Sequence, residues 1–532
     1  MRRPPVPAVI SDLYRDPRDL RILLVAALSL AAAGLDPHVF YPGLASVQSA
    51  VRARPDVEQL LMIAAVLAGL MLLVGGVLGD TDGRRRIHLA ALGTLFVSGA
   101  VGLLVPDGPL FVASRLVGAA MVSVILPFAL AGVAVTYQGV ARATAIGLAY
   151  AAFGGAMAAG PVLLTLFGPS GARWPAFVVS MLVSAIAFAA ARRYWPDLPS
   201  PSRRQRRRVI ATAVWAAGVI LTCMGVVGFG NGLTDIVRVA FLVVGLAVIA
   251  FAAVMERGVT HDDAVHVERR PVAMALLVGF IIAFTQAGPL LQLPLFFQVI
   301  NGYGPLVAVL ATLPFIIALI VTGPIVGLLL SRVRPRLLIT AGVVAVGLGN
   351  VLLAVALTPR ADYAFFILPL AFIGSGFVIA TTVRTAIIFA SVPRGLPATA
   401  AALNEASVAL GTRAGLVVGT LVISTLALDN LGRALAGEGT SVVDAATTVM
   451  RELLVAIGTP GFGVLVTEVP RPDRIEFALA YTDAIRTFLL ATGILTLGAA
   501  VLTWFLVGKR DPLTTVWEHR DERQPGPAAA NA

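Results

Sequence analysis

Charged residues are scarce in this sequence, and cysteine is almost missing from it. Only 13% of the 532 residues are charged and 58% are hydrophobic, whereas a soluble globular chain carries about 25% charged residues. Cys223 is the single cysteine, which excludes an internal disulfide and any cysteine-based metal or iron-sulfur site. The composition therefore predicts an integral membrane protein.

Several motifs that carry chemistry are missing as well. The sequence has no G-x-x-x-x-G-K-[ST] loop for ATP, no H-E-x-x-H pair for zinc, no nucleophile elbow and no acidic pair within its apolar segments. The net charge of +11 comes from arginines in short segments between apolar runs, not from a basic patch interleaved with aromatic residues. We therefore expect neither an enzyme nor a nucleic-acid-binding protein, and we expect no cofactor or metal.

What the sequence does contain is a series of long apolar runs. A helix needs about 20 apolar residues to cross the hydrocarbon core, and fourteen runs reach this length. The predicted fold is therefore an all-α integral membrane fold with 14 transmembrane helices. The runs lie near 22–42, 58–79, 87–105, 109–135, 143–167, 174–191, 209–230, 234–255, 272–300, 305–330, 337–357, 362–391, 401–427 and 485–508.

The arginines predict how these helices are oriented. They gather at the N-terminus and in the even-numbered connections, which the positive-inside rule assigns to the cytoplasm. We therefore expect a multi-pass protein of the cell inner (plasma) membrane with both termini cytoplasmic. The predicted segments are a cytoplasmic 1–21, a six-helix bundle at 22–191, a basic loop with two extra spans and a linker at 192–271, a second six-helix bundle at 272–508 and a cytoplasmic tail at 509–532.

The connection at 428–484 is unusually long and falls on the external side. Its stretch "SVVDAATTVMRELLVAIG" has helical apolar periodicity. Two interpretations remain open, a folded external hairpin or lid and an insertion packed on the outer surface.

A charged turn occurs twice. "GGVLGDTDGRRRIHL", residues 75–89, ends the second apolar run, and "GPIVGLLLSRVRPRLLI", residues 323–339, is a weaker copy in the second half. Parallel halves of this kind form transporters whose substrate cavity lies between them.

The first copy matches G-x-L-x-D-x-x-G-R-[KR], the loop signature of the major facilitator superfamily, through Gly76, Leu78, Asp80, Gly83, Arg84 and Arg85. Two spans inserted between six-span halves resemble the drug:proton antiporter branch of that family, as do Gly160 and Pro161 in the fifth span and Asp36 in the first. The resemblance implies the major facilitator fold and a gating motif in which Asp80 reaches a helix N-terminus of the opposite half. Gly83 would supply a tight or positive-φ backbone there. The alternative is that the arginines serve only as topology anchors.

Charged residues inside the spans are candidate functional residues, because each costs about 2.5 to 3.5 kcal/mol to insert. Asp36 and Arg115 lie at similar depths in the first and fourth spans, so we expect them to meet. Burial and a neighbouring cation act in opposite directions on the proton affinity of a carboxyl group. We therefore predict that Asp36 couples transport to protons and that Arg115 tunes it; the alternative is that Asp36, before Pro37, stabilises a break in the helix.

Other polar residues of the second half are candidates for the lining of the substrate cavity. In the ninth span Gln286, Gln292 and Gln298 surround two prolines that should kink the helix. Glu405 and Arg413 flank one face of the thirteenth span, with Glu405 as a residue that attracts cations. A structural pair between Arg384 and Glu405 is an alternative role for that glutamate.

These features together predict a proton-coupled efflux transporter of the multidrug-resistance type that exports amphipathic or cationic organic compounds by alternating access. Its partners would be the small-molecule substrate, protons and membrane lipids, and we expect a monomer. One alternative is an exporter of an endogenous lipid or secondary metabolite. Another is a membrane sensor that transports nothing, or an integral membrane enzyme.

Overall fold

The computed structural model describes residues 16–51, 83–105, 108–167, 174–195, 235–257, 269–359, 361–391, 397–435 and 473–507, with the single residues 71, 214, 218 and 221. All regular elements in these residues are helices, as the all-α prediction requires. Eleven of them are long and apolar enough to cross a membrane. Two other expected spans, 58–79 and 209–230, fall almost entirely outside the described residues, so the total of fourteen stays a prediction.

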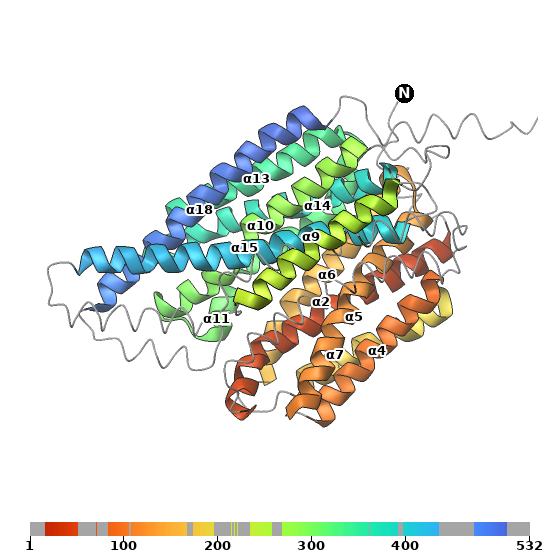
Figure 1. Cartoon of the computed structure of the whole chain (residues 1–532), viewed down its shortest axis with the longest axis horizontal. Helices are drawn as coiled ribbons and strands as arrows, with labels where there is room; N and C mark the ends of the chain where they lie inside the picture. Colours follow the sequence, from red (N-terminus) through yellow and green to blue (C-terminus); the bar gives the residue numbers. More distant parts are fainter. Residues whose placement is uncertain are drawn as a thin grey trace, which may run out of the picture.

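The helices form two bundles, which Figure 1 shows on opposite sides of the molecule. The N-terminal bundle contains α2 (Pro17–Val51), α4 (Arg84–Leu104), α5 (Gly108–Thr136), α6 (Gly139–Phe167) and α7 (Trp174–Tyr194). The C-terminal bundle contains α10 (Arg269–Val299), α11 (Pro305–Leu310), α12 (Leu313–Leu330), α13 (Pro335–Ala356), α14 (Ala364–Ser391), α15 (Pro397–Ala434) and α18 (Asp473–Leu506). The two-bundle organisation of the major facilitator fold is therefore present.

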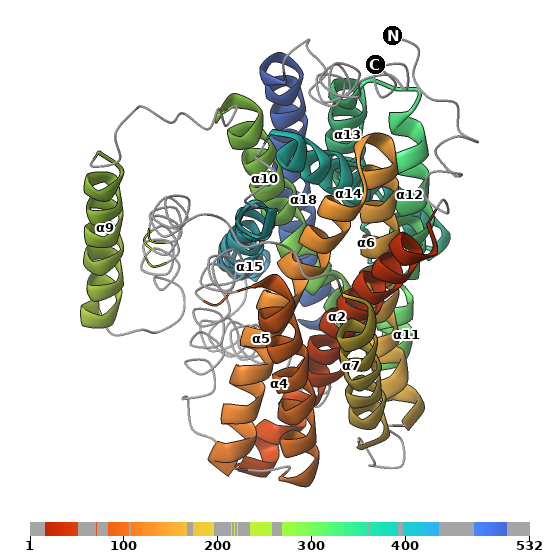
Figure 2. The ribbon, with the colours of Figure 1, turned by 90° about the vertical axis from the view of Figure 1, so that its right-hand side faces the viewer.

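One further helix, α9 (Asp235–Arg257), coincides with the expected span 234–255. Figure 2 shows it at the side of the molecule, apart from the labelled helices of both bundles. Its side chains are described over the apolar segment Val239–Phe251, where the large side chains Val239, Val243 and Leu246 are exposed.

Some helix limits differ from those expected. The single run 305–330 is divided into α11 and α12, because Pro314 near the start of α12 cannot donate a backbone hydrogen bond. α15 continues to Ala434 and α18 begins at Asp473, so the connection between them is shorter than the expected 428–484. The helical stretch expected within that connection lies outside the described residues.

Several helix ends that carry arginine meet at one end of the molecule. Arg85 of α4 donates from Nη2 to the carbonyl of Arg192 in α7, at 2.6 Å. Arg142 of α6 donates to the carbonyl of Phe389 in α14, at 3.3 Å, and so links the two bundles. We call this the arginine-rich end and define it by Arg21, Arg85, Arg142, Arg192 and Arg336, which contact the ends of α7, α14 and α18.

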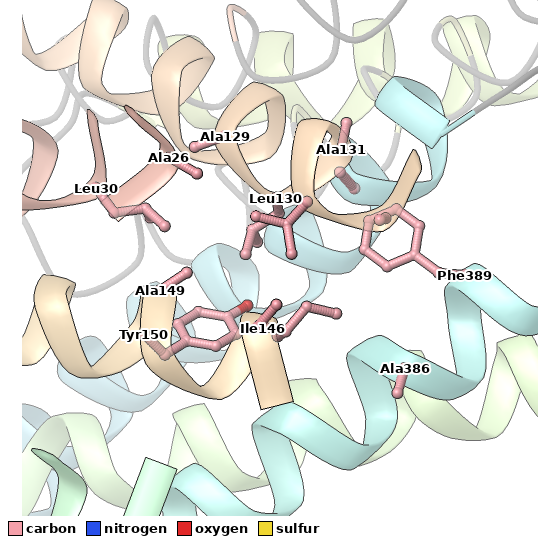
Figure 3. Close-up of a cluster of buried hydrophobic side chains, with 14 of the residues drawn as sticks. Ala26, Leu30, Ala129, Leu130, Ala131, Ile146, Ala149, Tyr150, Ala386 and Phe389 are labelled. Carbon is pink, nitrogen blue, oxygen red and sulfur yellow. The ribbon is translucent and has the colours of Figure 1, made fainter. Parts of the chain in front are cut away.

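The apolar core joins the two bundles at the arginine-rich end. One cluster contains Ile146 and Leu130 from the N-terminal bundle together with Ala386 and Phe389 from the C-terminal bundle, and Figure 3 shows these side chains in one close-up. The other clusters among the described residues belong to one bundle each, around Leu35 in one and around Phe296 and its neighbours in the other. The bundles are therefore closed against each other at the arginine-rich end.

Close packing of α6 on α12 supports this closure. A Cβ atom on Gly147 would collide with the carbonyl oxygen of Gly323, and one on Gly327 would collide with Thr144. Small residues let membrane helices approach to backbone contact, where dispersion forces are strongest. The second copy of the charged-turn motif thus contributes Gly327 to the joint between the bundles.

We predict that Gly147→Ala destabilises the protein, because the added methyl group must push α6 away from α12. Overpacking of this kind costs about 1 to 3 kcal/mol. The midpoint of thermal unfolding in detergent should fall by several degrees. Gly155→Ala on the same helix is the control, because its Cβ would lie 3.8 Å from Ile320, an ordinary contact distance. Equal midpoints for the two variants would contradict the proposed packing.

Candidate functional site

A buried ion pair lies inside the N-terminal bundle. Arg115 Nη1 of α5 is 3.3 Å from Asp36 Oδ1 of α2, and their side chains are only 6% and 10% exposed. Ser98 of α4 accepts a hydrogen bond from Arg115 Nη2 at 2.8 Å, and Ser180 of α7 donates one to Asp36 at 3.4 Å. Four helices therefore converge on two opposite charges, and the expected meeting of Asp36 and Arg115 is observed.

Two glycines make room for this site. A Cβ atom on Gly118 would lie 2.7 Å from Ser98 Oγ and 3.6 Å from Asp36 Oδ2, and one on Gly102 would lie 3.3 Å from Arg115 Nε. α2 is continuous across Pro37. The structure thus gives no support to the alternative in which Asp36 stabilises a helix break.

A second polar cluster crosses between the bundles. Tyr150 of α6 donates its hydroxyl proton to Glu405 Oε1 of α15 at 2.7 Å. Asn404 donates to the same oxygen at 2.8 Å and accepts from Arg384 Nη1 of α14 at 2.7 Å. The contact between Arg384 and Glu405 is therefore bridged by Asn404.

The glutamines of α10 face different neighbours. Gln286 donates to Asn350 Oδ1 of α13 at 3.2 Å, and Gln292 accepts from the Tyr481 hydroxyl of α18 at 2.5 Å. Both are almost fully buried within the C-terminal bundle. Gln298 donates to the carbonyl of Pro294 in its own helix, at 3.2 Å. The structure does not bring the three side chains together, and their part in binding substrate stays a prediction.

The gating motif is described only in part. Gly83 has a φ of 102°, the positive-φ backbone expected of it, and Arg84 is buried at the start of α4. Gly76 and Asp80 lie outside the described residues, as does the side chain of Arg413. In the antiporter motif Gly160 is buried within α6, and the side chain of Pro161 is not described.

Sequence reasoning missed several residues of these sites. Ser98 and Ser180 complete the ion-pair site, and Tyr150 links the bundles. Tyr150 stands among small residues in "GLAYAAFGG", and a hydroxyl within an apolar span usually needs a hydrogen-bond partner. That signal singles out Tyr150, but not the glutamate that it contacts.

Two helical bundles packed face to face, with buried charges inside them, define a membrane transporter of the class that works through two halves. Comparison of sequences gives the family. The sequence profile of the Major Facilitator Superfamily matches residues 22–416. The chain belongs to this superfamily.

Its relatives include drug- and antibiotic-resistance proteins. The chain is 29% identical over 476 residues to the puromycin resistance protein pur8 of Streptomyces alboniger, covering 85% of this chain and 91% of that one. It is 26% identical over 409 residues to the multidrug resistance protein Stp of Mycobacterium tuberculosis, covering 75% of each. The multidrug efflux pump LfrA of Mycolicibacterium smegmatis is 25% identical over 371 residues, covering 68% and 71%.

Solved structures show the same fold. The proton:xylose symporter XylE superposes with a TM-score of 0.57 at 16% identity, covering 94% of this chain and 98% of that one. The human organic anion transporter MFSD10 superposes with a TM-score of 0.55 at 14% identity, covering 93% and 100%. These likenesses show that the chain has the major facilitator fold.

We predict that Asp36→Leu and Arg115→Leu each destabilise the protein, because each leaves an unpaired buried charge. Removing one partner of a buried pair costs about 3 to 5 kcal/mol, whereas replacing both by apolar residues is often neutral. The double variant should therefore unfold, in detergent, at a higher temperature than either single variant. A double variant less stable than both single variants would contradict the pairing.

Proposed function

We propose that this protein is a proton-coupled efflux transporter that exports amphipathic or cationic organic compounds by alternating access. The observation that carries the proposal is the Asp36–Arg115 pair, a titratable carboxyl group buried beside a cation in the N-terminal bundle. An ionisable residue inside a membrane bundle marks an ion or substrate pathway more often than a packing contact. The relatives named for multidrug resistance and efflux support the substrate class.

In this proposal the proton binds at Asp36. Arg115 and Ser180 stabilise the charged carboxylate, whereas burial favours the neutral acid. A modest change in water access can then switch the protonation of such a group. Opening on the external side lets Asp36 take up a proton, and opening on the other side lets it release the proton as substrate enters.

We place the arginine-rich end in the cytoplasm, together with both termini, by the positive-inside rule. Because the bundles are closed at that end, this structure corresponds to a state closed to the cytoplasm. The gating motif lies at the same end, where Gly83 precedes α4 and Arg85 holds α4 to α7. We propose that Asp80 latches this end shut.

We further propose that the substrate binds between the bundles, on the side of α10 and α15. Gln298 and Glu405 are the partly buried candidates there, and Arg413 follows Glu405 two turns along α15. Gln286 and Gln292 hydrogen-bond to α13 and α18 within the C-terminal bundle. They would support the substrate-binding surface of α10 from its opposite side.

The sharpest test of proton coupling is Asp36→Asn. The amide keeps the shape of the side chain but cannot titrate, so downhill exchange of substrate should survive while pH-driven uphill export is lost. The measurement is accumulation of a cationic dye, with release of protons, in inverted vesicles under an imposed pH gradient. Asp429→Asn is the matched control, because Asp429 forms an exposed ion pair with Arg433 on the surface of α15.

Retention of uphill export with unchanged pH dependence in Asp36→Asn would overturn the role of Asp36. A wild-type protein that moves no dye but moves a neutral lipid would instead favour the alternative of a lipid or metabolite exporter.

We predict that Gly83→Val lowers transport at least tenfold while the protein still inserts. A β-branched residue is strained at a φ of 102°, so the turn that carries the latch must rearrange. Initial transport rates at equal expression provide the measurement. Gly498→Val is the control, because Gly498 lies within a helix and a Cβ atom there would meet nothing within 4 Å. Equal turnover in both variants would reject the latch.

A further inference from the structure

The polar cluster between the bundles contains two contacts that must break when the bundles part, and both involve the Tyr150 hydroxyl, which donates to Glu405 at 2.7 Å and accepts from Asn404 Nδ2 at 3.5 Å. Tyr150 belongs to α6 of the N-terminal bundle, whereas Glu405, Asn404 and Arg384 all belong to the C-terminal bundle. Tyr150 itself is packed in the apolar cluster that closes the arginine-rich end, where Figure 3 shows it next to Ile146. Separation of the bundles at this end therefore takes the Tyr150 hydroxyl away from Glu405.

Arg384 is not fully satisfied in the closed arrangement. Its side chain is fully buried, and its Nη1 donates to Asn404 and, at 3.3 Å, to Ser407. Its Nε and Nη2 atoms have no hydrogen-bond partner among the described residues. A buried guanidinium gains most from a carboxylate, which accepts from two of its nitrogens at once.

Glu405 is well placed to become that partner. Asn404 touches both groups, with its amide nitrogen on Glu405 Oε1 and its carbonyl oxygen on Arg384 Nη1. The guanidinium and the carboxylate are therefore separated by one amide group. Glycine at position 279 leaves the space that Arg384 occupies, because a Cβ atom there would lie 2.5 Å from Nη1.

We infer that Glu405 exchanges partners during transport, binding Tyr150 while the bundles are closed at the arginine-rich end and Arg384 once they separate. The exchange gives this partly buried carboxylate a partner in both states, so neither state carries the penalty of an unpaired charge. It makes Tyr150 a positioning residue of the closed state and Arg384 one of the open state. The inference rests on the alternating access of the proposed function, but not on its substrate or its proton.

The exchange can be tested by the accessibility of one buried position. Ala386 of α14 is fully buried in the cluster that joins the bundles. Ala386→Cys, made in a Cys223→Ser background, provides a single thiol that a membrane-impermeant maleimide can reach only when the arginine-rich end opens. The initial labelling rate is measured in inside-out and right-side-out vesicles, without substrate or proton gradient, so that the accessible side is identified as well.

Tyr150→Phe should raise the labelling rate about tenfold, since losing a hydrogen bond to a charged group shifts a two-state equilibrium by roughly that factor. Tyr363→Phe is the matched control, because its hydroxyl donates to the Ala311 carbonyl within the C-terminal bundle, at 3.2 Å. It should leave the rate unchanged. A Tyr150→Phe rate equal to that of the control would overturn the inference.

A second pair of variants distinguishes partner exchange from an alternative in which the hydrogen bond between Tyr150 and Glu405 only stabilises the closed state. In the Tyr150→Phe background, either Glu405→Gln or Arg384→Gln removes the ion pair of the open state, so the labelling rate should fall severalfold from that of Tyr150→Phe alone. Glu405→Gln keeps the size of the side chain and serves if Arg384→Gln does not fold. Undiminished labelling in the Glu405→Gln double variant would show that Arg384 takes no part and would overturn the exchange. Because no proton enters the readout, this failure is distinct from a failure of Asp36→Asn.

Discussion

The fold depends on the rule that a charge buried in a membrane bundle must find its partner inside the protein. Arg115 and Asp36 satisfy this rule because they form an ion pair and hydrogen-bond to two serines of neighbouring helices. Their pairing requires α2, α4, α5 and α7 to converge, and Gly118 allows the close approach at this point. The arrangement of the N-terminal bundle and the chemistry of its site therefore have the same cause.

The joint between the bundles follows a different principle. It is built from small and apolar residues, with the backbone of Gly147 against that of Gly323 and a cluster that includes Ile146 and Phe389. Such contacts have no directional bonds, so they can separate and form again at little cost beyond lost dispersion. The hydrogen bonds from Tyr150 to Glu405 and from Arg142 to the Phe389 carbonyl add directional contacts to this mostly apolar surface.

Much of this could be predicted from the sequence, and the exceptions have physical reasons. Apolar runs located most helices. The similar depths of Asp36 and Arg115 in their spans were enough to predict their contact, because both residues lie within one bundle. Hydropathy marks only the hydrocarbon core, so it missed the extension of α15 to Ala434, where Arg433 and Asp429 pair one turn apart at 2.7 Å on an exposed surface. The contact between Tyr150 and Glu405 depends on how two bundles dock, which no periodicity within either helix reports.

The carboxyl groups of Asp36, which is buried, and Glu405, which is partly buried, are placed so that they respond to different events. The hydrogen-bond partners of Asp36 among the described residues, Arg115 and Ser180, belong to its own bundle, so separation of the bundles leaves this pairing intact and changes only the access of water. Glu405 has a partner across the joint, so the same separation changes its contacts directly. Under the proposed function, Asp36 binds and releases the proton, whereas Glu405 changes its hydrogen-bond partner with the conformation. Coupling then needs no direct contact between them, because both are biased by the same rigid-body movement.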